Sequence, residues 1–118
     1  MKPRFVVCCA LLCFCTVAVV ISQDAAKVDA QHYKVESENS QVRILRFHYG
    51  PHEKSVMHSH PNSVVVYLTD GKARFHFADG KTQDVDAKAG GTDFVAAMTH
   101  DPENIGDKAF DGILVELK

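Results

Sequence analysis

Cysteine is confined to the first 15 residues of this 118-residue sequence. Residues 16–118 therefore offer neither disulfide bridges nor thiolate metal ligands. Clusters of Lys or Arg are missing as well, which makes nucleic acid and anionic membrane surfaces poor candidates as partners. The sequence also lacks internal repeats and any stretch with a clear helical hydrophobic period, which argues against a helical protein.

The N-terminus has the pattern of a secretory signal peptide. Lys2 and Arg4 precede residues 5–21, which carry no charge, and compact residues end the run. We predict cleavage after Ser22 and an exported protein, periplasmic or extracellular. An uncleaved anchor is the alternative, but the run is short for a membrane span of about 20 apolar residues.

Residues 23–118 are enough for one small domain. They hold 11 basic and 15 acidic residues, a net charge of −4. We predict a signal peptide at 1–22, a leader and first strand at 23–40, and the main domain at 41–118, with residues 23–31 flexible. After cleavage no membrane contact is expected.

The main domain reads as a series of about eight short strands. Residues 41–49 are predicted as a strand with imperfect alternation, and residues 63–69 as a buried strand rich in β-branched side chains. Asp70-Gly71 and Asp79-Gly80 look like hairpin turns between strands. A final strand is expected at residues 112–117. Frequent turns between short strands predict an all-β sandwich or barrel.

The chemistry concentrates in histidines. His58 and His60 are one residue apart just before an apolar run, and His100 lies forty residues further on. Side chains at i and i+2 of a strand share one face, so two imidazoles point the same way. Two neutral imidazoles with a third nearby form a transition-metal site.

These motifs resemble the two signature stretches of the cupin family. His58-Ser59-His60 matches the paired histidines of the first stretch, and Gly71 falls in its closing glycine slot. His100 and Asn104 match the end of the second stretch at the family's separation. The resemblance covers residues 42–117 and implies a double-stranded β-helix, the cupin jelly-roll barrel, of the small single-domain bacterial type.

The resemblance also implies a metal site at His58, His60 and His100. Val64 falls where the family carries a carboxylate ligand, so the sequence is similar to the three-histidine subset of cupins, which includes Fe(II) dioxygenases. Fe(II) is the favoured ion, with Zn, Mn, Ni or Cu as alternatives. Glu53, with Glu103 second, could replace the missing carboxylate; otherwise Glu53 is the nearest candidate for a catalytic base. Asn104 is expected to orient a loop or His100.

Several functions stay open at this point. The first is a metal-dependent enzyme, dioxygenase- or isomerase-like, acting on a small molecule. The second is a non-catalytic module that binds a small ligand or a metal, and the third is a structural protein with an inactive pocket. An enzyme should keep an acid or base within reach of the three histidines. A homodimer is expected by resemblance, through the strand at residues 42–49 or the C-terminal strand.

Overall fold

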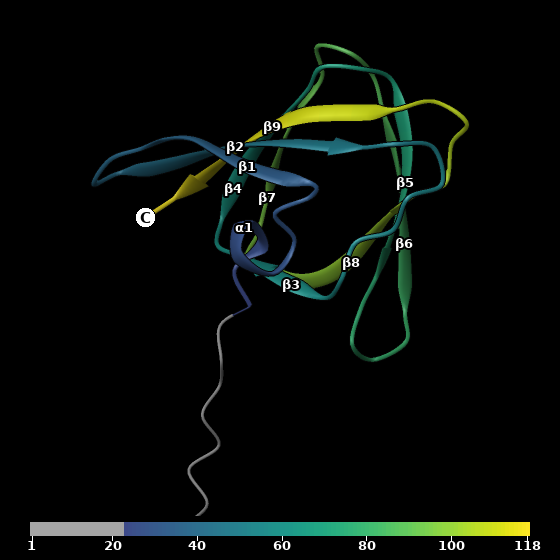
Figure 1. The fold of residues 1–118 in the computed structure, drawn as a ribbon, viewed down its shortest axis with the longest axis horizontal. Helices are drawn as coiled ribbons and strands as arrows, with labels where there is room; N and C mark the ends of the chain where they lie inside the picture. Colours follow the sequence, from purple (N-terminus) through teal and green to yellow (C-terminus); the bar gives the residue numbers. More distant parts are fainter. Residues whose placement is uncertain (1–22) are drawn as a thin grey trace, which may run out of the picture.

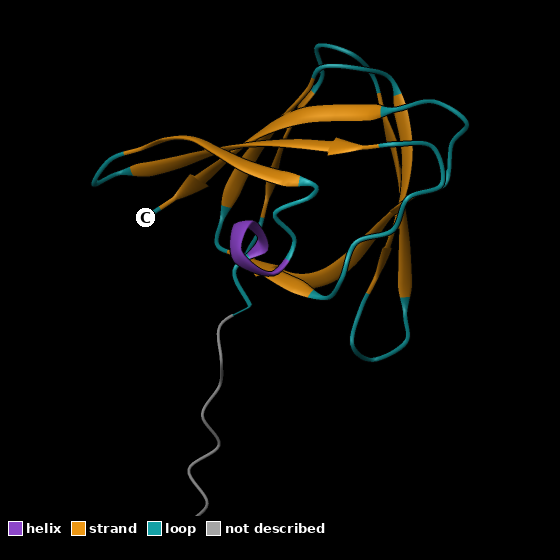
Figure 2. Cartoon of the chain, in the orientation of Figure 1, coloured by secondary structure: helices purple, strands orange, loops and turns teal. Residues whose placement is uncertain are grey.

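A computed structural model describes residues 23–118, and the predicted signal peptide lies outside this range. The described chain folds into a β-barrel with one short helix beside it, as Figure 1 and Figure 2 show. In chain order the elements are α1 (Ala25–Val28), β1 (Tyr33–Glu38), β2 (Val42–Tyr49), β3 (His58–His60), β4 (Ser63–Tyr67), β5 (Gly71–His76), β6 (Thr82–Ala87), β7 (Thr92–Val95), β8 (Met98–Asn104) and β9 (Phe110–Leu117).

The strands form two sheets that enclose the core. One sheet has the order β1-β2-β9-β4-β7 and the other β3-β8-β5-β6. Residues alternate between buried and partly exposed along β4 and β9, so Val65 and Leu114 point inward while their chain neighbours point outward. The core is apolar and aromatic, with Leu45 fully buried at its centre. The predicted all-β barrel is confirmed.

One of the two predicted hairpins is correct. Asp79-Gly80 joins the paired strands β5 and β6, and Gly80 has the positive φ of 83° that such turns favour. The prediction for Asp70-Gly71 is wrong, because β4 and β5 belong to different sheets. Gly71 is needed there for space: a Cβ at this position would lie 2.3 Å from the Phe110 ring.

The prediction of a flexible leader is also wrong. Asp24 caps α1 by accepting a hydrogen bond from the Ala26 amide at 2.9 Å, and Ala25 is fully buried. The helix contacts β1 and β3, and Figure 1 shows it beside β3. Burial of one small face and a bridge between Asp24 and Ser59 order a segment that looks too polar to fold.

The sheet order corrects the expected dimer surface. β2 and β9 are both interior strands, paired on each side, so neither offers a free edge. The edges of this sheet are β1 and β7. The homodimer itself stays a prediction. Within the described part of the chain, no helix has the length and apolarity needed to cross a membrane.

Candidate metal centre

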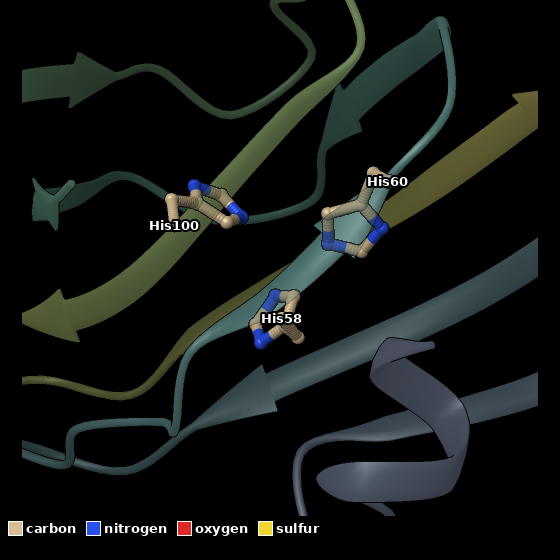
Figure 3. Close-up of side chains that lie close together, drawn as sticks. All are labelled: His58, His60 and His100. Atoms are coloured by element: carbon tan, nitrogen blue, oxygen red, sulfur yellow. The ribbon is translucent and has the colours of Figure 1, made fainter. Parts of the chain in front are cut away.

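Two neighbouring strands bring the three predicted histidines together. β3 pairs with β8 in antiparallel register, which sets His58 directly opposite His100. His60 follows two residues after His58 and shares its face. The three side chains are buried and each offers a nitrogen within 4.8 Å of the others. Figure 3 shows the rings gathered on one side of the two strands.

The Nδ1 atoms of the two histidines on β3 already have hydrogen-bond partners. His58 Nδ1 lies 2.8 Å from the carbonyl oxygen of Val56, and His60 Nδ1 lies 2.9 Å from Glu116 Oε1. Because both partners only accept hydrogen bonds, Nδ1 carries the proton in each neutral ring. The lone pair is thus left on Nε2, the atom that a metal would take.

Three ring nitrogens of the cluster have no hydrogen-bond partner within residues 23–118 and are therefore suited to bind a metal. His58 Nε2 and both ring nitrogens of His100 are buried without a hydrogen-bond partner among the described residues. A buried polar atom without a partner is costly, and such atoms usually mark an unseen ligand or a functional role. Three converging imidazoles are a common ligand set for first-row divalent ions.

Burial keeps these imidazoles in the form that binds metals. Desolvation, together with the neighbouring His60, lowers the pKa of His58 from 6.5 to about 4. Desolvation and the two neighbouring histidines lower the pKa of His100 to about 2. Both rings are therefore neutral at physiological pH, and their lone pairs are available.

Aromatic side chains hold the cluster in place. The Phe75 ring meets His100 edge-on at 4.4 Å between centroids, and the Tyr33 ring meets His58 in the same manner at 4.9 Å. Burial raises the pKa of Tyr33 well above 10, so its hydroxyl keeps its proton. Tyr33 also accepts a hydrogen bond from Tyr49 at 2.9 Å.

A cavity of about 520 Å³ opens inside the barrel against His60 and His100. Its walls are largely aromatic and aliphatic, with polar residues among the remaining lining side chains. Asp93 brings a carboxylate to this lining, and none of the described lining residues is Lys or Arg. The aromatic residues that line it are Tyr33, Phe47, Tyr49, Tyr67, Phe75, Phe94 and Phe110.

Strand β4 supplies no carboxylate to the cluster. Val64 lies at an outward position of β4, and the inward neighbours are Ser63 and Val65. The two predicted substitutes lie elsewhere and are not part of the cluster of ligand atoms. Glu103 alternates to the other face of β8 from His100, with Oε1 3.7 Å from His76 Nε2.

The structure places Glu53 next to another histidine. Its Oε2 lies 2.8 Å from His32 Nε2, and this hydrogen bond lowers the pKa of Glu53. Asp29 binds the other nitrogen of His32 at 2.8 Å, and the His32 ring stacks on Tyr49. The catalytic role of Glu53 stays a prediction, and its partner His32 is buried.

Asn104 orients a loop, as one of its two expected roles requires. Its amide nitrogen donates to the carbonyl oxygens of Gly50 at 3.0 Å and Lys108 at 2.8 Å. Its Oδ1 accepts from the Gly106 amide at 3.0 Å. No hydrogen bond joins Asn104 to His100 in the described structure, so the contact at His100 is not observed.

Glu116 was not predicted as a site residue, although the sequence carries a signal for it. Glu116 is 3% exposed, and its two oxygens bind His60 and Arg43. On β9, Gly112, Leu114 and Glu116 are two residues apart and share the inward face. A single charge on the buried face of a strand is expected to have a partner, which here is a candidate metal ligand.

Comparison with known proteins identifies the fold. No protein-family model matches the sequence, and no similar curated protein is found. A cupin domain from Bordetella pertussis superposes with a TM-score of 0.67 at 22% identity, over 73% of this chain and 91% of that chain. A double-stranded β-helix protein from Klebsiella pneumoniae gives 0.58 at 22% identity, over 72% and 74%.

A third similar structure is oxalate decarboxylase from Bacillus subtilis, a protein with Mn(II) centres. The TM-score is 0.50 at 27% identity, over 64% of this chain and 21% of that chain. The barrel therefore has the double-stranded β-helix fold of these cupin-type structures, as the motifs around His58 and His100 predicted.

Proposed function

We propose that this protein is an exported metal-binding cupin that uses His58, His60 and His100 to hold a divalent transition metal. One observation carries the proposal. Three buried imidazoles converge on one point. In His58 and His60 the Nδ1 atom is hydrogen-bonded, which leaves Nε2 free to coordinate a metal. Three neutral ligands leave the charge of the ion uncompensated and its remaining positions open for a small molecule.

The site is best suited to a first-row ion. Imidazole ligands suit Zn, Cu, Fe and Ni, and Mn(II) in the similar oxalate decarboxylase adds a further candidate. We favour Fe(II). When bound, the ion would supply Lewis acidity or, if it is iron, oxygen activation.

The protein's own residues prepare the pocket for such chemistry. Glu116 keeps the proton of His60 on Nδ1 and thereby frees Nε2. Tyr33 and Phe75 cover His58 and His100 and keep bulk water from them. The Tyr33 ring packs against His58 and His60, and its hydroxyl remains protonated, so it could hold a proton for a bound molecule.

The cavity favours a small, mainly apolar ligand. Its walls are aromatic and its described lining residues include no cation, so an anionic ligand could be paired only with the metal. We therefore expect a neutral organic molecule with one group that coordinates the ion. Our preferred hypothesis is a dioxygenase- or isomerase-like enzyme.

A non-catalytic ligand-binding module is the second candidate, and a specific observation supports it. The carboxylate predicted as a base, Glu53, is bound to His32 rather than to any of the three histidines. Turnover separates the two functions. Oxygen consumption and product formation would be screened with the Fe(II)- and Zn(II)-loaded protein over a panel of small apolar molecules.

The same screen includes a variant and its control. If the protein is an enzyme, His100→Ala should abolish turnover, whereas His76→Ala, on the neighbouring strand outside the cluster, should retain it. Binding of panel members to the loaded protein without any turnover would favour the binding module. The prediction for Glu53 is tested in parallel, since Glu53→Gln should lower kcat only if Glu53 is the base.

Export is a separate part of the proposal and has a separate test. The charged start followed by uncharged residues 5–21 supports it. The protein recovered from the periplasm or medium of an expressing bacterium should begin at Gln23 by intact mass. A full-length protein in the cytoplasm or in the membrane fraction would contradict export.

A further inference from the structure

The short helix α1 has an aspartate at each end, and both side chains reach beyond the helix. Asp24 is the N-cap and Asp29 the C-cap. The C-cap acts through its backbone, because the Asp29 amide donates to the Ala25 carbonyl oxygen. The carboxylate of Asp29 is thus not needed for capping, and Asp24 uses only one of its two oxygens on the helix.

The second oxygen of Asp24 begins a chain of contacts that ends at His60. Asp24 Oδ2 lies 2.7 Å from an Arg43 guanidinium nitrogen. The Arg43 side chain also donates to Glu116 Oε2 at 2.7 Å. Glu116 Oε1 in turn accepts from His60 Nδ1 at 2.9 Å. Arg43, Glu116 and His60 are each at most 15% exposed, so solvent screens these interactions little.

The carboxylate of Asp29 begins a second chain that ends at His58. The Ser55 hydroxyl donates to Asp29 Oδ2, and Ser55 Oγ lies 3.2 Å from His58 Nδ1. Since the hydroxyl proton goes to Asp29, Ser55 Oγ is left as an acceptor for the His58 N–H, alongside the Val56 carbonyl oxygen. His32 fixes Asp29 from the other side with contacts of 2.8 and 2.9 Å.

The segment that carries both aspartates is attached to the strand that carries both histidines. The Ser59 amide, between His58 and His60, donates to the Gln23 carbonyl oxygen at 2.7 Å. Asp24 and Ser59 form a parallel bridge, and α1 contacts β3. Residues 23–32 thus lie along the free edge of β3, as Figure 1 shows for α1.

We propose that residues 23–32 form a clamp in which Asp24 and Asp29 act as positioning residues for His60 and His58, through Arg43–Glu116 and through Ser55 respectively. The inference rests on the proposed metal site and adds to it the residues that set its affinity. In the first chain the Glu116 carboxylate lies directly behind His60, and in the second the Asp29 carboxylate acts on His58 through the Ser55 hydroxyl. A hydrogen-bond partner behind a ligand imidazole fixes the ring and increases its basicity. Loss of such an outer contact typically weakens metal binding by about 10- to 100-fold.

Asparagine substitutions test the clamp while preserving its shape. Asp24→Asn keeps an oxygen that can cap α1, and Asp29→Asn keeps the backbone cap. Glu116→Gln serves as the reference for a direct loss at His60. Glu36→Gln is the matched control, because it breaks an exposed Arg46 ion pair on the β1–β2 hairpin whose two members belong to neither chain.

The first measurement is Zn(II) and Co(II) affinity by competition with a chelator, together with the Co(II) absorption spectrum. We expect Glu116→Gln to weaken binding by about 10- to 100-fold. Asp24→Asn and Asp29→Asn should each weaken it at least threefold, and the double variant by about the product, because the two chains reach different histidines. The Co(II) band should shift in these variants and stay unchanged in Glu36→Gln.

A second measurement does not depend on metal. Long-range ¹H–¹⁵N NMR of the metal-free protein reports which ring nitrogen carries the proton. His58 and His60 should both be protonated on Nδ1 in the wild type, with the His60 signals perturbed by Asp24→Asn and those of His58 by Asp29→Asn. If Asp29→Asn does not fold, Ser55→Ala breaks the same chain without altering a buried charge.

The outcomes separate the clamp from the metal site. The clamp would be overturned if Asp24→Asn and Asp29→Asn bind metal within twofold of the wild-type affinity and leave the ring signals as they are in Glu36→Gln. This holds even if the wild type binds metal. A wild type that binds no metal, with the predicted changes in ring signals, would leave the clamp standing and overturn the proposed function.

Discussion

The depressed pKa values of His58 and His100 predict that the metal-free protein loses stability in mild acid. Below pH 6.5 the unfolded chain takes up a proton on each of these histidines, whereas in the folded protein they stay neutral down to about pH 4 and about pH 2. Proton uptake by the unfolded state alone favours unfolding. The stability is therefore fully present above pH 6.5 and is lost as the pH falls.

The size of the effect follows from these values. Each group that is protonated only in the unfolded state costs about 1.4 kcal/mol per pH unit below pH 6.5. Between pH 7.5 and pH 4.5 this amounts to about 2.5 kcal/mol for each histidine and about 5 kcal/mol for both. A loss of this size is comparable to the whole stability of many small domains.

Urea unfolding of chelator-treated protein at several pH values between 7.5 and 4.5 measures this loss. The comparison is with His100→Gln, which cannot be protonated at this position and should lose about 2.5 kcal/mol less over the same range. Contributions from other titrating groups cancel in this difference. Carboxylates with lowered pKa, such as Asp24, act mainly below this range. Equal losses in wild type and His100→Gln would contradict a depressed pKa of His100 in the folded protein.

Three further predictions concern the scaffold. Asn104→Ala leaves the buried carbonyl oxygen of Gly50 without its donor and should lower the free energy of unfolding by about 2–4 kcal/mol in urea, with metal content unchanged. A stable variant would show that water replaces the amide. Gly112→Ala places a Cβ 2.2 Å from Phe47 Cζ and 2.9 Å from the Val66 carbonyl oxygen, so a loss of about 1–3 kcal/mol in thermal unfolding is expected, and no loss would contradict the tight contact. Light scattering of residues 23–118 should give the mass of two chains, and a monomer at all concentrations would dismiss the expected homodimer.

The barrel and the three histidines could be predicted from the sequence because their signals are local. His58 and His60 share a face by strand alternation alone, and Asp79-Gly80 is a turn whatever surrounds it. The local sequence could not show that the strands on either side of Asp70-Gly71 belong to different sheets. A turn signal does not say whether the next strand returns to the same sheet or crosses to the opposite one.

The contacts behind the histidines come from residues distant in the sequence. Glu116 reaches His60 across 56 positions, and Asp24 reaches the same ring through Arg43 and Glu116. Residues 23–31 look polar and flexible from their composition alone. They are ordered by β3, which offers a free edge and a place for Ala25. Such order depends on the tertiary structure, and local composition does not reveal it.

The central claim is that His58, His60 and His100 bind a metal. Elemental analysis of residues 23–118, purified without a histidine tag, tests it most directly beside the His58→Ala/His60→Ala/His100→Ala variant and the His76→Ala control. About one transition-metal equivalent is expected in wild type and His76→Ala, and none in the triple variant. No metal in the wild type, even after incubation with Fe(II), Zn(II), Mn(II), Ni(II) and Cu(II), would contradict it.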